Sequence, residues 1–249
     1  MLEIKELFAG YKKEWILKNI SLSLNTGEVT TVIGKNGCGK STLLRAVIGA
    51  LPNVKGNISV NGEDIRYLSV TERSKRISYL AQDKNIPDIT VFRMVLSGRF
   101  PHLSYPRRYR EKDIAVANIA MEKMGIGDFR ERKLSELSGG MRQKVYIAMA
   151  LCQETEIILM DEPTSYLDIT QQFLLADTVR SLAKEDKTIL LVLHDILLAL
   201  KISDKVVLID DAGIGFIGTP SEFVSSGLPE RVYGVRICSA GEEYYYERI

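Results

Sequence analysis

Short runs of apolar and β-branched residues alternate along this chain with longer segments whose apolar positions recur at helical spacing. Continuous β-branched runs predict buried strands, whereas apolar residues at i, i+3, i+4 and i+7 predict helices. Two strands are expected within the first 26 residues, and further strands at 29–33, 56–60, up to residue 80, and at 157–160, 188–193 and 206–209. Helices are expected at 41–48, 91–96, 113–124, from 138 onward, and at 168–184 and 196–202. This order predicts an α/β fold built around a parallel sheet.

The segment from 83 to 137 breaks the alternation, because strand-like runs give way there to helical ones. We interpret it as an α-helical insertion at about 83–140, within a single domain that spans 1–249. A loop rich in arginine and aromatic residues, 98–110, lies inside it. Such a loop is typical either of a partner-binding surface or of a solvated charged face. The last stretch, 231–249, carries three consecutive tyrosines and is expected to be a tail without recognisable chemistry.

The composition limits the classes of partner. A formal net charge of +1 gives no overall attraction to nucleic acid or acidic lipid, so no nucleic-acid partner is expected. Three scattered cysteines exclude a disulfide framework and a metal cluster, and indicate a cytosolic setting. The N-terminus lacks the apolar core of a signal peptide, and the longest apolar tract, 189–200, is too short and too interrupted to span a bilayer. Any work at a membrane is therefore expected to go through another protein.

The stretch from Gly34 to Thr42 matches the phosphate-binding pattern G-x-x-x-x-G-K-[ST], and it lies between a predicted strand and a predicted helix, as that motif requires. Backbone N–H groups of such a loop point at phosphate from the positive end of the helix. Lys40 is expected to reach the β- and γ-phosphates, and the Ser41 hydroxyl to ligate Mg²⁺. The same setting predicts a lowered pKa for the Cys38 thiol. The predicted nucleotide-binding residues are Gly34, Asn36, Gly37, Cys38, Gly39, Lys40, Ser41 and Thr42.

Two acids, Asp161 and Glu162, follow the apolar strand 157–160 directly. They are expected at the carboxyl edge of the sheet, where ligands bind in open α/β folds. Beside a phosphate-binding loop, Asp161 suits Mg²⁺, and Glu162 is placed to orient or deprotonate an attacking water.

Ser138, Gly139 and Gly140 open another helix and predict a second anion site. A single nucleotide requires two such helix N-termini only if it is held from both sides.

In order and spacing, the phosphate-binding loop, residues 137–140 and residues 161–164 resemble the nucleotide-binding subunits of ABC transporters. The resemblance implies an α/β P-loop NTPase core of the ABC type, with an antiparallel β subdomain and an inserted α-helical subdomain. It also implies ATP as the nucleotide and Mg²⁺ as the cofactor. Tyr11 is then placed to stack on adenine, and Gln82 to contact Mg²⁺ and a membrane partner.

The same resemblance implies the remaining roles. The catalytic set is Glu162, His194 and Lys40, and the metal-binding set is Ser41, Gln82 and Asp161. The family forms head-to-tail homodimers, so Ser138, Gly139, Gly140 and Asp168 of one chain are expected to contact ATP held by the other chain.

Residues 95–102, 163–169 and 228–235 are similar to the ATP-binding subunits of importers for iron-siderophore complexes, haem and cobalamin. That likeness implies an ATPase at the cytoplasmic face of the membrane, working with transmembrane permease subunits and, indirectly, an extracytoplasmic substrate-binding protein. The basic residues from Arg99 to Arg110 are expected near the permease groove. The alternatives are a soluble, non-transport ABC ATPase, an importer of another small solute such as amino acids, and a non-hydrolysing ATP-binding scaffold.

Overall fold

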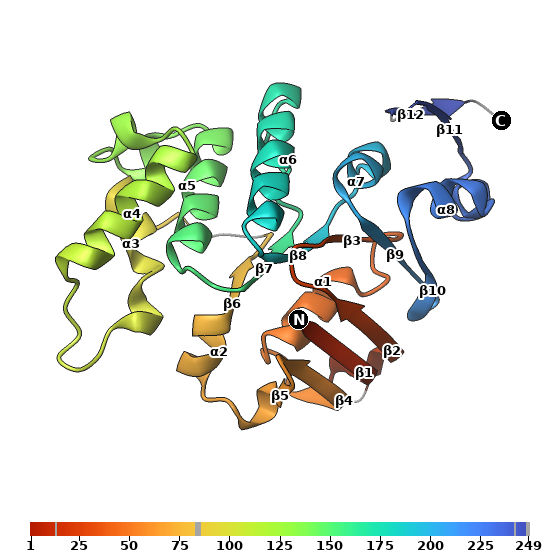
Figure 1. Cartoon of the computed structure of the whole chain (residues 1–249), viewed down its shortest axis with the longest axis horizontal. Helices are drawn as coiled ribbons and strands as arrows, with labels where there is room; N and C mark the ends of the chain where they lie inside the picture. The colour runs from red at the N-terminus through yellow and green to blue at the C-terminus, as the bar shows by residue number, and fades with distance from the viewer. Residues whose placement is uncertain (13, 83–85, 242, 248–249) are drawn as a thin grey trace.

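The computed structural model describes residues 1–12, 14–82, 86–241 and 243–247. In these ranges a central sheet has the strand order β10-β9-β3-β8-β7-β6 (Figure 1). Its strands are β3 (Val29–Ile33), β6 (Ile77–Leu80), β7 (Ile157–Asp161), β8 (Thr188–Val192), β9 (Lys205–Asp210) and β10 (Gly213–Gly218). Neighbouring strands are parallel, except that β10 runs antiparallel to β9. The predicted parallel sheet is therefore confirmed, and β3, β7 and β8 are buried at every position, as their continuous apolar runs require.

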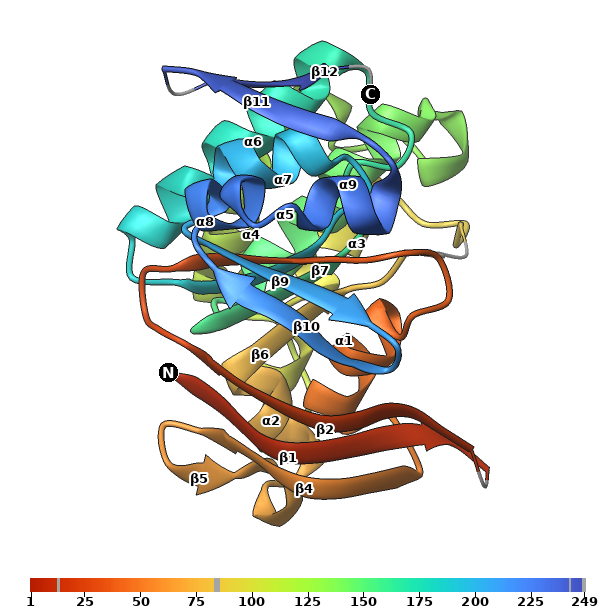
Figure 2. The ribbon, with the colours of Figure 1, turned by 90° about the vertical axis from the view of Figure 1, so that its right-hand side faces the viewer.

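A second, antiparallel sheet has the order β2-β1-β4-β5 and packs below the first (Figure 2). Its strands are β1 (Leu2–Tyr11), β2 (Glu14–Leu24), β4 (Asn53–Val60) and β5 (Glu63–Asp64). Helix α1 (Lys40–Val47) lies between the two sheets and contributes its apolar face to their shared core, which contains Leu7, Leu43, Leu44, Val47 and Leu159. This sheet fixes α1 from below, and so fixes the loop that precedes it.

Helices gather at the end of the molecule beyond β6 (Figure 1, left). They are α3 (Val91–Ser97), α4 (Glu111–Lys123) and α5 (Gly139–Cys152), with short 3-10 turns at η2 (Phe100–His102), η3 (Gly127–Phe129) and η4 (Leu134–Glu136). The 3-10 turn η1 (Ile65–Tyr67) and helix α2 (Val70–Arg76) precede β6 and lie on the side of the antiparallel sheet (Figure 1). Helices α3, α4 and α5 share one apolar core. The helical character of the predicted insertion is confirmed, whereas its limits at 83–140 stay a prediction, and residues 83–85 lie outside the described ranges.

Arg99 differs from the sequence prediction. Its side chain is 7% exposed, and its guanidinium forms ion pairs with Asp113 of α4 at 3.2 Å and with Glu154 at 2.7 Å. It also donates to the Cys152 carbonyl at the end of α5. The sequence analysis groups Arg99 with the basic residues of the loop, but in the structure Arg99 turns inward and joins α4 to α5, while the expected position of the loop near a permease stays a prediction.

Helices α6 (Ile169–Lys184) and α7 (Ile196–Ile202) cover the face of the central sheet opposite α1 (Figure 1). The chain then forms α8 (Pro220–Ser225), α9 (Leu228–Tyr233) and a hairpin of β11 (Arg236–Ala240) and β12 (Glu243–Glu247) that packs beside α7. Within the described residues, the segment expected to be a tail therefore forms the end of α9 and two paired strands, and β10 was also missed. In the described ranges no helix is both long and apolar enough to cross a bilayer.

Candidate nucleotide site

The loop between β3 and α1 folds as the phosphate-binding pattern predicts. Gly34 and Gly39 have φ angles of 149° and 107°, which side-chain-bearing residues rarely adopt. A Cβ atom on Gly34 would lie 2.5 Å from the Ile209 carbonyl oxygen, and one on Gly39 would lie 2.6 Å from Leu17 Cδ2. Only glycine fits at either position, so the loop can wrap closely around a ligand at the N-terminus of α1.

Lys40 is held over this loop by the loop itself. Its Nζ donates to the carbonyl oxygens of Gly34, at 2.8 Å, and of Lys35, at 3.0 Å. The side chain is buried, with 6% of the residue exposed. A buried ammonium without a carboxylate partner among the described residues is available to an anionic ligand.

Asp161 ends β7 with both carboxylate oxygens occupied. Oδ1 accepts from the Ser41 hydroxyl at 3.0 Å, and Oδ2 accepts from the Tyr79 hydroxyl at 3.2 Å. Burial raises the pKa of Asp161, and the two hydrogen bonds oppose that rise. Tyr79 was not predicted as a site residue, because the sequence around a tyrosine in a strand does not indicate that its hydroxyl contacts Asp161 on the adjacent strand. Its pKa is raised to about 12 by burial and by the charge of Asp161.

Glu162 lies between two polar side chains that are remote in sequence. Gln82 Nε2 donates to Oε2 at 2.6 Å, and the His194 Nε2 contacts Oε1. The Glu162 backbone has a φ of 49°, an unfavourable value for a residue with a side chain, and its N–H donates to the Val192 carbonyl at 3.0 Å. The edge between β7 and β8 therefore fixes this carboxylate at the cost of local strain.

Lys40 and Glu162 line a cavity of about 440 Å³, whereas Asp161 and Gly34 lie behind its wall and are not part of the lining. That volume is in the range of small-molecule sites. The lining consists of Tyr11, Ile16, Asn36, Gly37, Gly39, Lys40, Ser41, Thr42, Gln82, Glu162 and His194. Tyr11 is 39% exposed, and its hydroxyl accepts from Arg45 at 3.0 Å. Ile16 is an apolar wall beside it that the sequence reasoning missed. The structure thus gathers residues from the phosphate loop and the start of α1, from β1 and β2, and from the turns after β6, β7 and β8.

Cys38 does not line this cavity, although its neighbours in the loop do. Its thiol turns toward the back of the loop, where a Cβ atom on Gly34 would lie 2.7 Å from the sulfur. Burial raises the pKa of the Cys38 thiol, while the Lys40 charge opposes the shift. The prediction of a lowered pKa was wrong, because burial outweighs the nearby cation and N–H groups.

The turn Ser138–Gly140, which we call the signature turn, lies elsewhere. Ser138 caps α5 by accepting from the Met141 N–H at 3.3 Å. Gly139 lines a separate cavity of about 250 Å³ together with Arg142, Tyr166 and Gln82. Asp168 caps α6 by accepting from the Gln171 N–H at 2.8 Å. Within one chain, the cavity of the phosphate-binding loop is lined by none of the signature residues.

The residues present fit a magnesium nucleotide. In the described ranges no group of three or more His, Cys, Asp or Glu residues is arranged to hold a metal ion. Ser41 and Asp161 instead offer hard oxygen donors within 3.0 Å of each other. Mg²⁺ is typically bound by one or two protein oxygens, with phosphate oxygens and waters completing its shell. This donor set therefore suits an ion that arrives with a nucleotide.

Comparison with known proteins agrees with this geometry. Residues 17–165 match the family described as ABC transporter. The achromobactin transport ATP-binding protein CbrD of Dickeya dadantii is 38% identical over 233 residues, which cover 93% of this chain and 87% of that protein. The ferric enterobactin transport ATP-binding protein FepC of Escherichia coli is 38% identical over 234 residues, covering 93% and 86%. The iron(3+)-hydroxamate import ATP-binding protein FhuC of Bacillus subtilis is 35% identical over 236 residues, covering 94% and 88%.

Solved structures give the same fold. A nucleotide-free ATP-binding cassette from an ABC transporter matches with a TM-score of 0.84 and 25% identity, over 94% of this chain and 97% of that one. An inward-facing ABC transporter assigned to the metal-chelate type matches with a TM-score of 0.83 and 26% identity, over 99% and 95%. The chain therefore belongs to the ABC transporter family, as an ATP-binding ATPase.

Proposed function

We propose that this chain hydrolyses ATP to drive the import of a metal chelate, an iron-siderophore complex or a related compound such as haem or cobalamin. The main support for ATP hydrolysis is the position of the Glu162 carboxylate, which lies between Gln82 and His194 at the edge of the phosphate-loop cavity. The observation that favours a chelate is the set of relatives, whose names specify achromobactin, ferric enterobactin and iron hydroxamate.

Nucleotide binding follows from the loop and its lysine. The N–H groups at the start of α1 face the cavity with Gly37, Gly39 and Lys40. Lys40 exchanges its bonds to the Gly34 and Lys35 carbonyls for bonds to the β- and γ-phosphates. The ring of Tyr11, half exposed at the rim, stacks on adenine.

The metal site is formed by Ser41, Asp161 and Gln82. When bound, Mg²⁺ neutralises charge on the β- and γ-phosphate oxygens. Ser41 would hold the ion with its hydroxyl oxygen, and Asp161 with its carboxylate, directly or through a water. Tyr79 donates to the other carboxylate oxygen, so it holds Asp161 in one orientation.

Glu162 is the general base of hydrolysis. Its carboxylate accepts a proton from the attacking water, whose oxygen bonds to the γ-phosphorus as the bond to ADP breaks. His194 contacts the Oε1 atom of Glu162 and lies in the same cavity, where it can also donate to the γ-phosphate. The bond from the Glu162 N–H to the Val192 carbonyl holds the strained backbone in place, and so keeps the carboxylate at the cavity.

A second copy of the chain completes the site. The signature turn carries a helix N-terminus with two glycines, but it lies outside the phosphate-loop cavity of its own chain. In a head-to-tail homodimer, Ser138, Gly139, Gly140 and Asp168 of one chain contact the ATP held by the other. Each ATP is then held between two helix N-termini.

Transport requires partners. ATP-binding import subunits work with transmembrane permeases, and we place this chain at the cytoplasmic face of the membrane, where its single domain contacts the permease through the helical insertion at about 83–140. An extracytoplasmic substrate-binding protein then acts through the permease and not through this chain.

Uptake assays in a deletion strain test the proposed substrate class. The strain is expected to lose uptake of a ferric siderophore, haem or cobalamin, and to regain it with the wild-type gene but not with Glu162→Gln. Normal uptake of all three compounds, together with loss of uptake of another solute, would overturn the proposal that the substrate is a metal chelate. Purification of the tagged chain from detergent-solubilised membranes without any permease would favour the soluble, non-transport alternative.

A further inference from the structure

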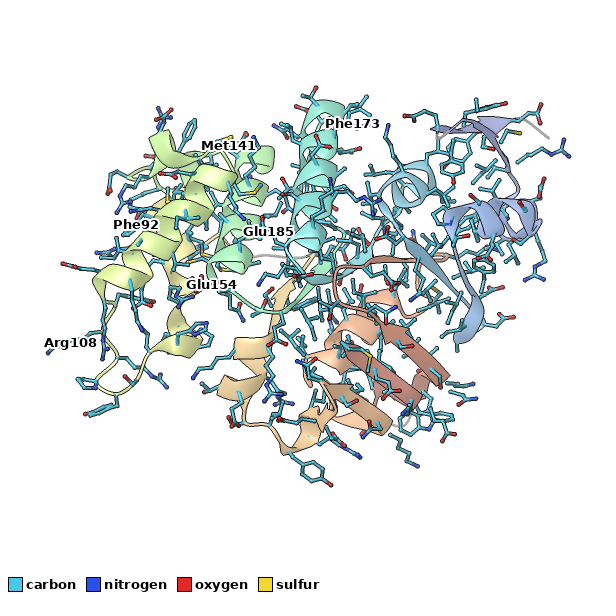
Figure 3. All side chains as sticks on the ribbon, in the orientation of Figure 1. Phe92, Arg108, Met141, Glu154, Phe173 and Glu185 are labelled. Atoms are coloured by element: carbon cyan, nitrogen blue, oxygen red, sulfur yellow. The ribbon has the colours of Figure 1, made fainter. Side chains whose placement is uncertain are left out.

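The loop between η2 and α4 carries a group of exposed cationic and aromatic side chains. We call this group the basic tip, and it consists of Tyr105, Arg107, Arg108, Tyr109 and Arg110. The sequence analysis expects the arginines among them near the permease groove, and none of the five residues lines the phosphate-loop cavity or the cavity beside the signature turn. Figure 1 places the loop at the end of the molecule farthest from the C-terminal hairpin, and in Figure 3 Arg108 extends outward from that end.

The base of this loop is fixed to the helices. On one side, buried Arg99 bonds to Asp113 and Glu154, and the His102 ring bonds to the Gln153 carbonyl at 2.8 Å. On the other side, the Arg110 backbone N–H donates to Asp113 at 2.9 Å. Because both ends are fixed, the exposed residues between them are presented outward from a defined point on the helical end.

The cations of the basic tip are not neutralised. Arg107, Arg108 and Arg110 are exposed, and no ion pair between them and an acid is found in the described ranges. Asp113, which accepts from the Arg110 backbone N–H, is paired with the Arg99 guanidinium. Arg107 instead lies over the Phe100 ring, 4.5 Å from its centroid. The tip therefore carries a local positive charge on a chain whose net charge is only +1.

The two tyrosines of the basic tip are also exposed. Tyr105 is 96% and Tyr109 is 40% accessible. A tyrosine with an apolar ring and a polar hydroxyl is typical of the boundary between membrane and water. Guanidinium groups bind phosphate oxygens in pairs. Arginines without an acidic partner thus suit the lipid phosphates, and the exposed tyrosines beside them suit the boundary between membrane and water.

We propose that the basic tip contacts anionic phospholipid headgroups of the membrane that holds the permease. This inference rests on the proposed function, because it requires that the chain work at a membrane. A stable protein interface buries about 800 Å² on each partner and has an apolar core at its centre. Five exposed side chains on one loop offer no such core, whereas a charged lipid surface requires none. The contact orients the helical end relative to the bilayer while the helices contact the permease.

Vesicle co-sedimentation with the purified full chain tests the proposal. The vesicles contain phosphatidylcholine alone or with phosphatidylglycerol, at low and at high salt. The test variant is Arg107→Gln/Arg108→Gln/Arg110→Gln. The matched control is Lys18→Gln/Lys184→Gln/Arg231→Gln, which removes three exposed cations from other faces and changes the net charge equally.

The wild type is expected to bind only the anionic vesicles, and less at high salt. Each arginine near an anionic surface contributes about fivefold in partition, so the triple tip variant should bind roughly 10²-fold more weakly. Tyr105→Ser should give a smaller loss. The control variant should bind like the wild type, and soluble ATP hydrolysis should be unchanged in every variant.

Equal binding by the tip variant and the wild type, or an equal loss in the control, would overturn the proposal. Weaker binding of the tip variant than of the wild type to permease-containing vesicles of phosphatidylcholine alone would overturn it too, in favour of an acidic permease segment. Absence of ATP hydrolysis in the wild type would instead contradict the proposed function, so the two failures are distinguishable.

Discussion

The phosphate-binding edge and the signature turn are two anion-binding features of one chain, yet they differ in completeness. At the phosphate-binding edge, defined by Lys40, Ser41, Asp161 and Glu162, every functional side chain has a partner within the chain. At the signature turn, Ser138 only caps its own helix, and Gly139 lines a different cavity. The phosphate-binding edge is therefore assembled within one chain, whereas the signature turn is available to a second chain.

This difference indicates how control over hydrolysis is arranged. In the proposed function, the carboxylates of Glu162 and Asp161 serve as base and metal ligand, and both are already held by contacts within one chain, so binding does not depend on a second chain. Completion of the proposed site does depend on one. Gln82 lines both cavities and donates a hydrogen bond to Glu162. A second chain that contacts the signature-turn cavity could therefore alter the position of the proposed base through Gln82. Variants that affect only one region should therefore separate binding from turnover.

The largest effect is expected at Lys40. Lys40→Ala removes the buried ammonium above the loop, so ATP affinity should fall by at least ~10²-fold and hydrolysis should be lost with it. Isothermal titration with ATP measures the change. Lys35→Ala is the matched control, because it is exposed in the same loop and contributes only its carbonyl to Lys40. Equal losses in both variants would contradict the assignment.

Glu162→Gln should separate the two steps. The amide keeps the shape of the side chain but cannot accept the proton, so hydrolysis should fall by at least ~10²-fold while ATP affinity stays within a few-fold. Steady-state phosphate release and ATP titration give the two values. Near-wild-type turnover by this variant would rule out Glu162 as the base.

Gly139→Asp should impair the other region alone. A carboxylate at the signature turn repels the triphosphate of a second chain, so hydrolysis should fall by roughly 10- to 100-fold. ATP affinity of the single chain should not change, because the turn lies outside the cavity. Thermal unfolding should accompany the assay, since a Cβ atom there lies 3.2 Å from Tyr166 Cβ. Normal hydrolysis by a folded variant would show that the signature turn takes no part.

Tyr79→Phe should give the smallest effect and sharpen the description of the phosphate-binding edge. It removes one hydroxyl donor to Asp161, so the Mg²⁺ concentration for half-maximal hydrolysis should rise by about three- to tenfold. The change is measured by magnesium titration of the ATPase rate. Tyr67→Phe is the control, because that ring is exposed at a remote 3-10 turn. An unchanged magnesium requirement would remove Tyr79 from the site.

Local sequence was sufficient for the central fold and for most of the phosphate-binding edge. Strands 29–33 and 157–161 are continuous apolar runs, and a strand of that kind has few alternatives. The conformation of the phosphate loop could be predicted because its glycines stand at the positions where the backbone needs φ angles that other residues rarely adopt. Gln82, Glu162 and His194 come together as the family resemblance implies, but their spacing in sequence gives no distance between them.

What the sequence did not predict depends on contacts between distant segments. Arg99 in a basic loop resembles its exposed neighbours until α4 supplies Asp113 and the end of α5 supplies Glu154. The Cys38 pKa depends on which side of the loop the thiol faces. The C-terminal hairpin has short strands with mostly exposed residues, and its pairing, Ile237 with Tyr246 for example, is fixed only by packing beside α7.

Cross-linking tests most directly the central claim that two chains form one site. A chain with its native cysteines replaced carries Ser138→Cys, Asn36→Cys and Glu162→Gln, and it is treated with a short bis-maleimide with and without magnesium-ATP. The account predicts a covalent dimer that forms only with nucleotide and only when one chain offers Cys at 138 and another offers Cys at 36. A cross-link within a monomer, or no dimer with nucleotide bound, would contradict it.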